Sequence, residues 1–224
     1  MIKDDKIKID NELQGEGVKF LPFVGDHYEH GISFDKDGNL VLGTKENPGK
    51  KVLVLGESHY SDEELSDEEL SSFTREVLDC YLNSKERYSW MRTFLKFERA
   101  LFNKVTDIKD RKNIWNRLMF YNYLQRPLHG TRMAGDLEDY KDAADPFFAI
   151  LKMYKPDYII VWGRRLFANL PYENGVEGEY MPSVDMNSWS YQIDGLTIKI
   201  LPIYHPSVGF SWDYWHEVIV EFFK

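Results

Sequence analysis

A short polar stretch with acid–base side chains follows an apolar run early in the chain. The run spans 51–55, and Gly56-Glu57-Ser58-His59-Tyr60 come directly after it. Carboxyl, imidazole and phenol groups can hold a water molecule, stabilise a positive charge or donate a hydrogen bond. The run of Val and Leu predicts a strand that is covered on both faces, as in a parallel sheet. Because open α/β sheets place their sites at the carboxyl ends of strands, we expect chemistry here.

Three later predicted strands also end in polar residues. The strand 117–124 runs into Asn122-Tyr123-Leu124-Gln125-Arg126-Pro127, and the strand 156–163 is followed by Arg164 and Arg165. A hairpin that turns at Asp194-Gly195 has a second limb that ends at Tyr204-His205-Pro206-Ser207. The carboxyl ends of parallel strands meet at one edge of a sheet, so we expect Asn122 and His205 to line one cleft with Glu57 and Tyr60.

The remaining elements predict how these strand ends are positioned. Predicted helices alternate with the strands, which favours an α/β fold, a three-layer α/β/α sandwich with a mainly parallel central sheet. The first helix is expected to begin at Ser61, because Ser61 and Glu64 match a capping box. We expect a single domain in which 51–224 form the core. Residues 1–50 would pack on it as an N-terminal arm, irregular over 1–30, and a hairpin.

Composition narrows the function classes. The chain has 224 residues, a net charge of −9 and one cysteine, Cys80, which excludes an internal disulfide and any iron–sulfur or multi-cysteine zinc site. We therefore expect no metal and no cofactor. Six acids lie in two consecutive SDEEL repeats (61–70), so the net charge is −3 without them. This local acidity weakens the case for DNA binding without removing it.

The amino terminus and the apolar runs bear on the cellular location. No apolar run approaches the length of a membrane span, and the sequence MIKDDKIKID is too charged for a signal peptide. We expect a cytoplasmic protein that does not contact a membrane, and a monomer.

The four strand ends resemble the motifs of the uracil-DNA glycosylase superfamily, in the same order and spacing over 51–224. Gly56–Tyr60 is similar to the first motif, which has forms such as GQDPYH and GEAPG. The stretch 122–127 resembles NVVKCRPP, and KPDYIIVWGRRLFANLP resembles a strand and helix that begin RPRLIVALG. LPIYHPS resembles the last motif, PTYHP or HPS. The resemblance implies the glycosylase fold and hydrolysis of the N-glycosidic bond of uracil or a modified pyrimidine in DNA.

The chemistry of that reaction assigns expected roles. Cleavage produces an oxocarbenium-like sugar and an anionic base, so the site needs an anion, a hydrogen-bond donor and a positioned water. Glu57 would stabilise the sugar or hold the water, and His205 would donate to the base. Asn122 would read the pyrimidine edge. The other expected substrate-binding residues are Gly56, Ser58, His59, Tyr60 and Ser207, with Tyr60 forming the pocket wall and Ser207 holding a phosphate.

The sequence also departs from the family. Ser58 stands where the first motif has an aspartate or asparagine, so Glu57 would replace the usual aspartate. The branch of the family with this glutamate carries an iron–sulfur cluster, which one cysteine cannot support. Two other functions therefore stay open: a catalytically inactive module that binds a nucleotide or DNA, and a hydrolase of small nucleosides.

Several residues also have a purely structural interpretation. Glu57 could cap the next helix, His205 could be a satisfied buried histidine, and Asn122 could be a turn residue. Tyr60 could be an ordinary, partly buried aromatic residue. His27 and His30 have a spacing that can bind a metal, although a solvated loop is also consistent with it. Arg164 and Arg165 would contact phosphate or face water.

Overall fold

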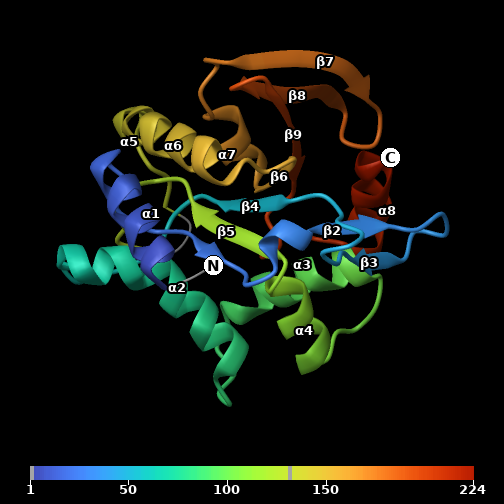
Figure 1. Ribbon diagram of the computed structural model, residues 1–224, viewed down its shortest axis with the longest axis horizontal. Helices are drawn as coiled ribbons and strands as arrows, with labels where there is room; N and C mark the ends of the chain where they lie inside the picture. The colour runs from blue at the N-terminus through green and yellow to red at the C-terminus, as the bar shows by residue number, and fades with distance from the viewer. Residues whose placement is uncertain (1–2, 131–132) are drawn as a thin grey trace.

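The computed structural model describes residues 3–130 and 133–224 (Figure 1). The helices are α1 (Lys3–Gly15), α2 (Asp67–Asn83), α3 (Met91–Phe102), α4 (Ile108–Trp115), α5 (Leu137–Asp142), α6 (Ala144–Tyr154), α7 (Arg164–Ala168) and α8 (Trp212–Phe223), with a short 3₁₀ helix at Tyr28–His30. The strands are β1 (Phe23–Val24), β2 (Ile32–Phe34), β3 (Leu40–Leu42), β4 (Val52–Gly56), β5 (Leu118–Asn122), β6 (Tyr158–Trp162), β7 (Gly175–Met181), β8 (Met186–Ile193) and β9 (Leu196–Ile203).

The described residues form an α/β protein around a seven-stranded mixed sheet, in the order β1-β5-β4-β6-β9-β8-β7. Strands β5, β4, β6 and β9 are parallel, whereas β1, β8 and β7 join them antiparallel. The sheet is thus only partly parallel, less so than the sequence predicted. Two antiparallel strands were not predicted: β7 lies within 171–188, where the sequence favours a loop, and β1 lies within 1–30, which we expected to be irregular. The predicted turn between β8 and β9 is confirmed, with φ of 50° at Asp194 and 77° at Gly195.

Helices cover both faces of the sheet, because successive strand residues face opposite sides. Leu53 and Leu55 of β4 pack in a core with residues of α1, α6 and α7. Val52 and Val54 pack in a second core with residues of α2, α3, α4 and α8. Figure 1 shows α6 and α7 on one side of β4 and β5, and α3 and α4 on the other. The strand ends between these two cores are therefore held by packing from both sides.

The first helix after β4 begins later than the sequence predicted. Helix α2 starts at Asp67, and its capping box uses Ser66 and Glu69 of the second SDEEL repeat. The prediction of a start at Ser61 is wrong, because the Ser61 backbone N–H donates to the carbonyl of Leu128 and keeps the chain extended there. The Ser61 hydroxyl accepts from the N–H of Glu63, two residues on, instead of capping a helix. The first repeat is consequently a loop that leads away from the strand end.

The N-terminal residues contribute more regular structure than expected. Residues 3–15 form helix α1, and β1 extends the sheet by pairing with β5. An ion pair between Arg75 and Asp10 (2.7 Å) fastens α1 to α2. The hairpin β2–β3 is confirmed, and Gly38 supplies the positive φ (84°) that its turn needs.

Strand β7 forms one edge of the sheet. Most of its residues are exposed, and its pairing with β8 shifts register between Glu177 and Tyr180, which marks a β-bulge. Within 3–130 and 133–224, no helix is both long and apolar enough to cross a membrane.

Candidate functional site

The expected site residues meet at the carboxyl edge of the parallel strands. Gly56 and Asn122 are paired across β4 and β5, and Trp162 and Ile203 are paired across β6 and β9. A Cβ atom on Gly163, the residue after β6, would lie 3.8 Å from Cβ of His205. The parallel register therefore brings Gly56, Asn122 and His205 to one edge, as the sequence predicted.

Glu57 is held in place by two other side chains. Arg165 donates from Nε to Oε1 of Glu57 at 2.9 Å and from a terminal nitrogen to Oε2, so the contact is bidentate. The Tyr140 hydroxyl donates to Oε1 as well. The side chain of Glu57 is 12% exposed, against 47% for Arg165. The carboxylate is thus fixed and mostly shielded, with its charge offset by a guanidinium that reaches solvent.

These contacts settle two of the structural interpretations. Glu57 does not cap α2, because Ser66 and Glu69 fill that role. Arg165, expected to contact phosphate or water, pairs with Glu57 and also donates to the carbonyl of Met133 at 3.1 Å. The hydrogen bond to Glu57 raises the pKa of Arg165. Burial, followed by the hydrogen bond to Glu57, raises the pKa of Tyr140. Both partners therefore remain protonated donors at neutral pH.

His205 is a neutral imidazole with one nitrogen left for a ligand. Its Nδ1 accepts from the backbone N–H of Ser207 at 3.2 Å and lies 2.6 Å from the Ser207 hydroxyl. An N–H can only donate, so Nδ1 is unprotonated and the ring hydrogen sits on Nε2. Burial lowers the pKa of His205, the Glu57 charge opposes this, and the Arg165 charge adds to it. Within the described residues Nε2 makes no hydrogen bond, which leaves a free donor.

Arg165 follows Gly163 by two residues, so its pairing with Glu57 places both charges at the same end of the sheet as His205. The ring of His205 packs edge-on against Trp162, with 6.2 Å between centroids and 83° between planes. A carboxylate, a guanidinium and an imidazole N–H thus share one end of the sheet. Such a set can stabilise a cation beside a group that becomes anionic.

Asn122 and His59 form a buried polar pair behind this edge. Both are 5% exposed, and Nδ2 of Asn122 donates to Nε2 of His59 at 3.1 Å. The same nitrogen of His59 lies 2.8 Å from the hydroxyl of Thr74 in α2. The Asn122 amide also lies against the backbone of Gly56, since a Cβ on Gly56 would lie only 2.1 Å from Asn122 Oδ1. Gly56 is therefore required for the position of this amide.

The environment of His59 is otherwise apolar. Its ring stacks on Phe73 at 4.5 Å and tilts against Phe20 at 4.8 Å. Burial lowers its pKa to about 3, so it is uncharged at neutral pH. His59 acts on the edge indirectly, by fixing the Asn122 amide. The contact of His59 with Thr74 could not be found from the sequence, because nothing in the pattern of α2 marks Thr74.

Two further expected residues have different surroundings. Tyr60 is 42% exposed and pairs through its backbone with Leu128. Its hydroxyl makes a small contribution to the raised pKa of Arg165. The Ser58 hydroxyl is buried and has no hydrogen-bond partner among 3–130 and 133–224. Tyr60 can therefore contact a ligand at the edge, whereas Ser58 lies inside.

The open metal hypothesis gains no support from geometry. His27 and His30 stack with their rings parallel at 5.0 Å. In the part of the chain that the structure describes, no group of three or more His, Cys, Asp or Glu side chains could hold a metal ion.

No family model matches the sequence, and a search of curated proteins found no relative.

Proposed function

We propose that this protein hydrolyses an N-glycosidic bond, as uracil-DNA glycosylases do, with uracil or a modified pyrimidine in DNA as its substrate. The observation that carries the proposal is the pairing of a fixed carboxylate, Glu57, with a neutral imidazole, His205, whose Nε2–H is free to donate. The proposal includes the finer fold assignment, a three-layer α/β/α sandwich of the glycosylase type. It also takes the protein to act in the cytoplasm as a monomer.

The two groups match the charges that develop in this reaction. The leaving base becomes anionic and needs a hydrogen-bond donor. His205 is held neutral with its proton on Nε2, and this N–H can donate to the base. The sugar becomes cationic, and Glu57 supplies the negative charge beside it. Ser207 orients the imidazole through its N–H and hydroxyl. Its expected contact with phosphate remains a prediction.

The base would be read by Asn122, whose amide is fixed by His59 and Gly56. A fixed amide discriminates between bases, because turning it over to fit a different hydrogen-bond pattern would break its contact with His59. Tyr60, exposed at the same edge, would form the wall of the base pocket. Gly56, Ser58 and His59 act in this proposal by shaping the position of Asn122 and Glu57 and not by touching the base.

One observation favours a second function. Both oxygens of Glu57 accept from Arg165, and Oε1 also accepts from Tyr140, which leaves little capacity for a catalytic water. A catalytically inactive module that binds a nucleotide or DNA would tolerate this arrangement. In the enzyme, Arg165 would have to turn away, or the carboxylate would act through its charge alone.

The test is release of free base from duplex DNA, single-stranded DNA and nucleosides that contain uracil, mismatched thymine or hypermodified pyrimidines. We expect release from DNA, with Glu57→Gln and His205→Ala each lowering turnover by about 100-fold or more. Substrate affinity should change much less, because these contacts strengthen in the transition state. Glu63→Gln, at an exposed acid of the first SDEEL repeat, is the matched control and should retain full activity.

Three outcomes would decide against the proposal. Equal losses of binding and turnover would favour the binding module, and so would DNA binding without base release. Base release from nucleosides alone would identify a small-nucleoside hydrolase.

A further inference from the structure

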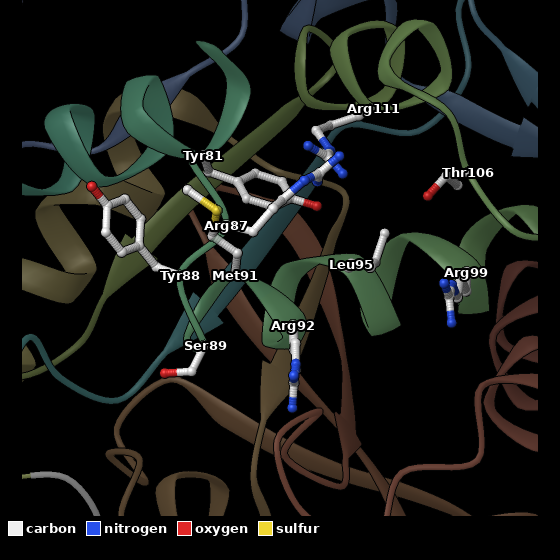
Figure 2. Close-up of a pocket in the computed structure, with 10 residues that line it drawn as sticks. All are labelled: Tyr81, Arg87, Tyr88, Ser89, Met91, Arg92, Leu95, Arg99, Thr106 and Arg111. Carbon is white, nitrogen blue, oxygen red and sulfur yellow. The ribbon is translucent and has the colours of Figure 1, made fainter. Parts of the chain in front are cut away.

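A second region of the molecule, independent of the sheet edge, has the properties of a ligand site. A cavity of about 500 Å³ lies among the end of α2, the loop after it, α3 and α4. Figure 2 shows the side chains around it. The polar and aromatic ones that matter here are Tyr81, Tyr88, Arg87, Arg92, Arg99 and Arg111. None of the residues that line this cavity belongs to the candidate site described above.

Arg111 is the most deeply placed of the four arginines. It is 5% exposed, and its guanidinium lies over the ring of Tyr81 at 4.4 Å. The Nε atom of Arg111 lies 3.6 Å from Oε1 of Glu98, too far for a hydrogen bond. This Nε atom has no hydrogen-bond partner within 3–130 and 133–224. In Figure 2 the guanidinium groups of Arg111 and Arg87 extend toward the same space beside Tyr81. A buried guanidinium whose Nε–H makes no hydrogen bond within the described residues has one donor available to an anionic ligand at that point.

Glu98 pairs with Arg111 and offsets one of the four positive charges around the cavity. It is completely buried and accepts hydrogen bonds from Tyr81 (2.5 Å), Trp115 (2.9 Å) and Thr106 (3.0 Å). The carboxylate thus links the side chains of Tyr81, Thr106 and Trp115, two of which line the cavity. Glu86 accepts a hydrogen bond from the Tyr88 hydroxyl at the rim and supplies a second negative charge, so four guanidinium groups and two carboxylates leave a net charge of about +2.

The other three arginines have no carboxylate partner. Arg87, Arg92 and Arg99 form no ion pair in the part of the chain that the structure describes, and Nε of Arg99 is buried without a hydrogen bond. The protein has a net charge of −9, so a cavity lined by four arginines is a local positive region on a negatively charged molecule. Such a cluster repels itself and raises the local potential for anions.

We propose that this cavity binds a small ligand that carries a diphosphate group. Guanidinium groups match phosphate oxygens in a bidentate fork, and a diphosphate with a free end carries about −3 at neutral pH, which is opposite in sign to the net charge of the cavity. The volume lies within the range of small-molecule sites, and exceeds what two phosphates need. Tyr88, which is 44% exposed at the rim, provides an aromatic face for the rest of the ligand.

The test is calorimetric titration of the full chain with inorganic pyrophosphate, orthophosphate and a short single-stranded DNA. We expect pyrophosphate to bind more tightly than orthophosphate, and its affinity to fall as salt is raised. Arg87→Gln and Arg92→Gln should each weaken pyrophosphate binding about tenfold, the loss expected for one charged hydrogen-bonded contact. Both side chains are exposed, so these variants should fold.

Lys36→Gln provides the matched control, because it removes one positive charge from an exposed turn outside the cavity. Pyrophosphate affinity should be unchanged in this variant. The proposal is overturned if pyrophosphate produces no heat at about 10 mM, a concentration at which even weak binding is visible. It is also overturned if the control weakens binding as much as the cavity variants do. DNA binding that depends on Arg87 and Arg92, without pyrophosphate binding, would make this face a contact for the nucleic-acid backbone instead.

Discussion

The buried imidazole of His59 should make the stability of the protein strongly dependent on pH. Burial lowers its pKa from 6.5 to about 3 in the folded protein, whereas the unfolded chain keeps the ordinary value. Between these two values the unfolded state binds more protons. The stabilisation from the neutral ring is therefore complete above pH 6.5 and is lost as the pH falls toward 3.

The magnitude follows from the two pKa values. At pH 5 the unfolded state gains about 2 kcal/mol from protonation of this one histidine, whereas the folded state gains almost nothing. The variant His59→Gln removes the titrating group and keeps an amide that can accept from Asn122 and Thr74. Urea denaturation at pH 7 and pH 5 should show that the wild type loses about 2 kcal/mol more than the variant does.

His129→Gln serves as the control, because His129 is an exposed residue of the loop that follows β5. That variant should keep the wild-type pH dependence. If wild type and His59→Gln lose the same free energy of unfolding between pH 7 and pH 5, the imidazole is not buried as described. A ring that titrates near pH 6 by NMR in the folded protein would refute the reasoning directly.

Three further outcomes are expected. Glu98→Ala should lower the free energy of unfolding by about 3–5 kcal/mol in urea denaturation, because it leaves a buried cation and several donors unpaired; a loss below about 1 kcal/mol would contradict this. Gly56→Ala should destabilise the protein by about 1–3 kcal/mol, since its Cβ would strike the Asn122 amide, while Gly15→Ala, with nothing within 4 Å, should be neutral or slightly stabilising. Arg165→Gln should raise the pKa of His205 in an NMR titration, because a neighbouring positive charge is removed; an unchanged or lower pKa would show that the two groups are not coupled.

The sequence predicted the strand ends well, because short runs of Val, Leu and Ile have few alternative structures. Strands β4, β5 and β6 lie where their apolar runs were found, and parallel pairing then placed Gly56, Asn122 and His205 together. The sequence also predicts helices over 144–154 and 212–223, and these are the bounds of α6 and α8. These elements follow from periodicity and from turn residues, which are local properties of the chain.

Other features depend on contacts that local patterns do not record. Both SDEEL repeats match a capping box, and only the backbone pairing of Ser61 with Leu128 decides that the second one starts the helix. The pairing of Glu57 with Arg165 joins residues that are 108 positions apart. Arg165 was noted as a residue after a strand, but its partner could not be inferred, because a guanidinium fits phosphate and carboxylate equally well.

The exposed strand β7 has a consequence for how the protein behaves in concentrated solution. An edge strand presents unpaired backbone groups on which another copy of the chain could add a strand. Here Glu177 and Glu179 place carboxylates along that strand, and the bulge before Tyr180 interrupts its regular spacing. The carboxylates repel the same strand of a second copy, and the bulge disrupts the pairing of the two backbones. Both features therefore discourage filament growth. Replacing both glutamates with glutamine removes this repulsion, so turbidity from edge-to-edge aggregation should appear in that variant at a lower protein concentration than in the wild type.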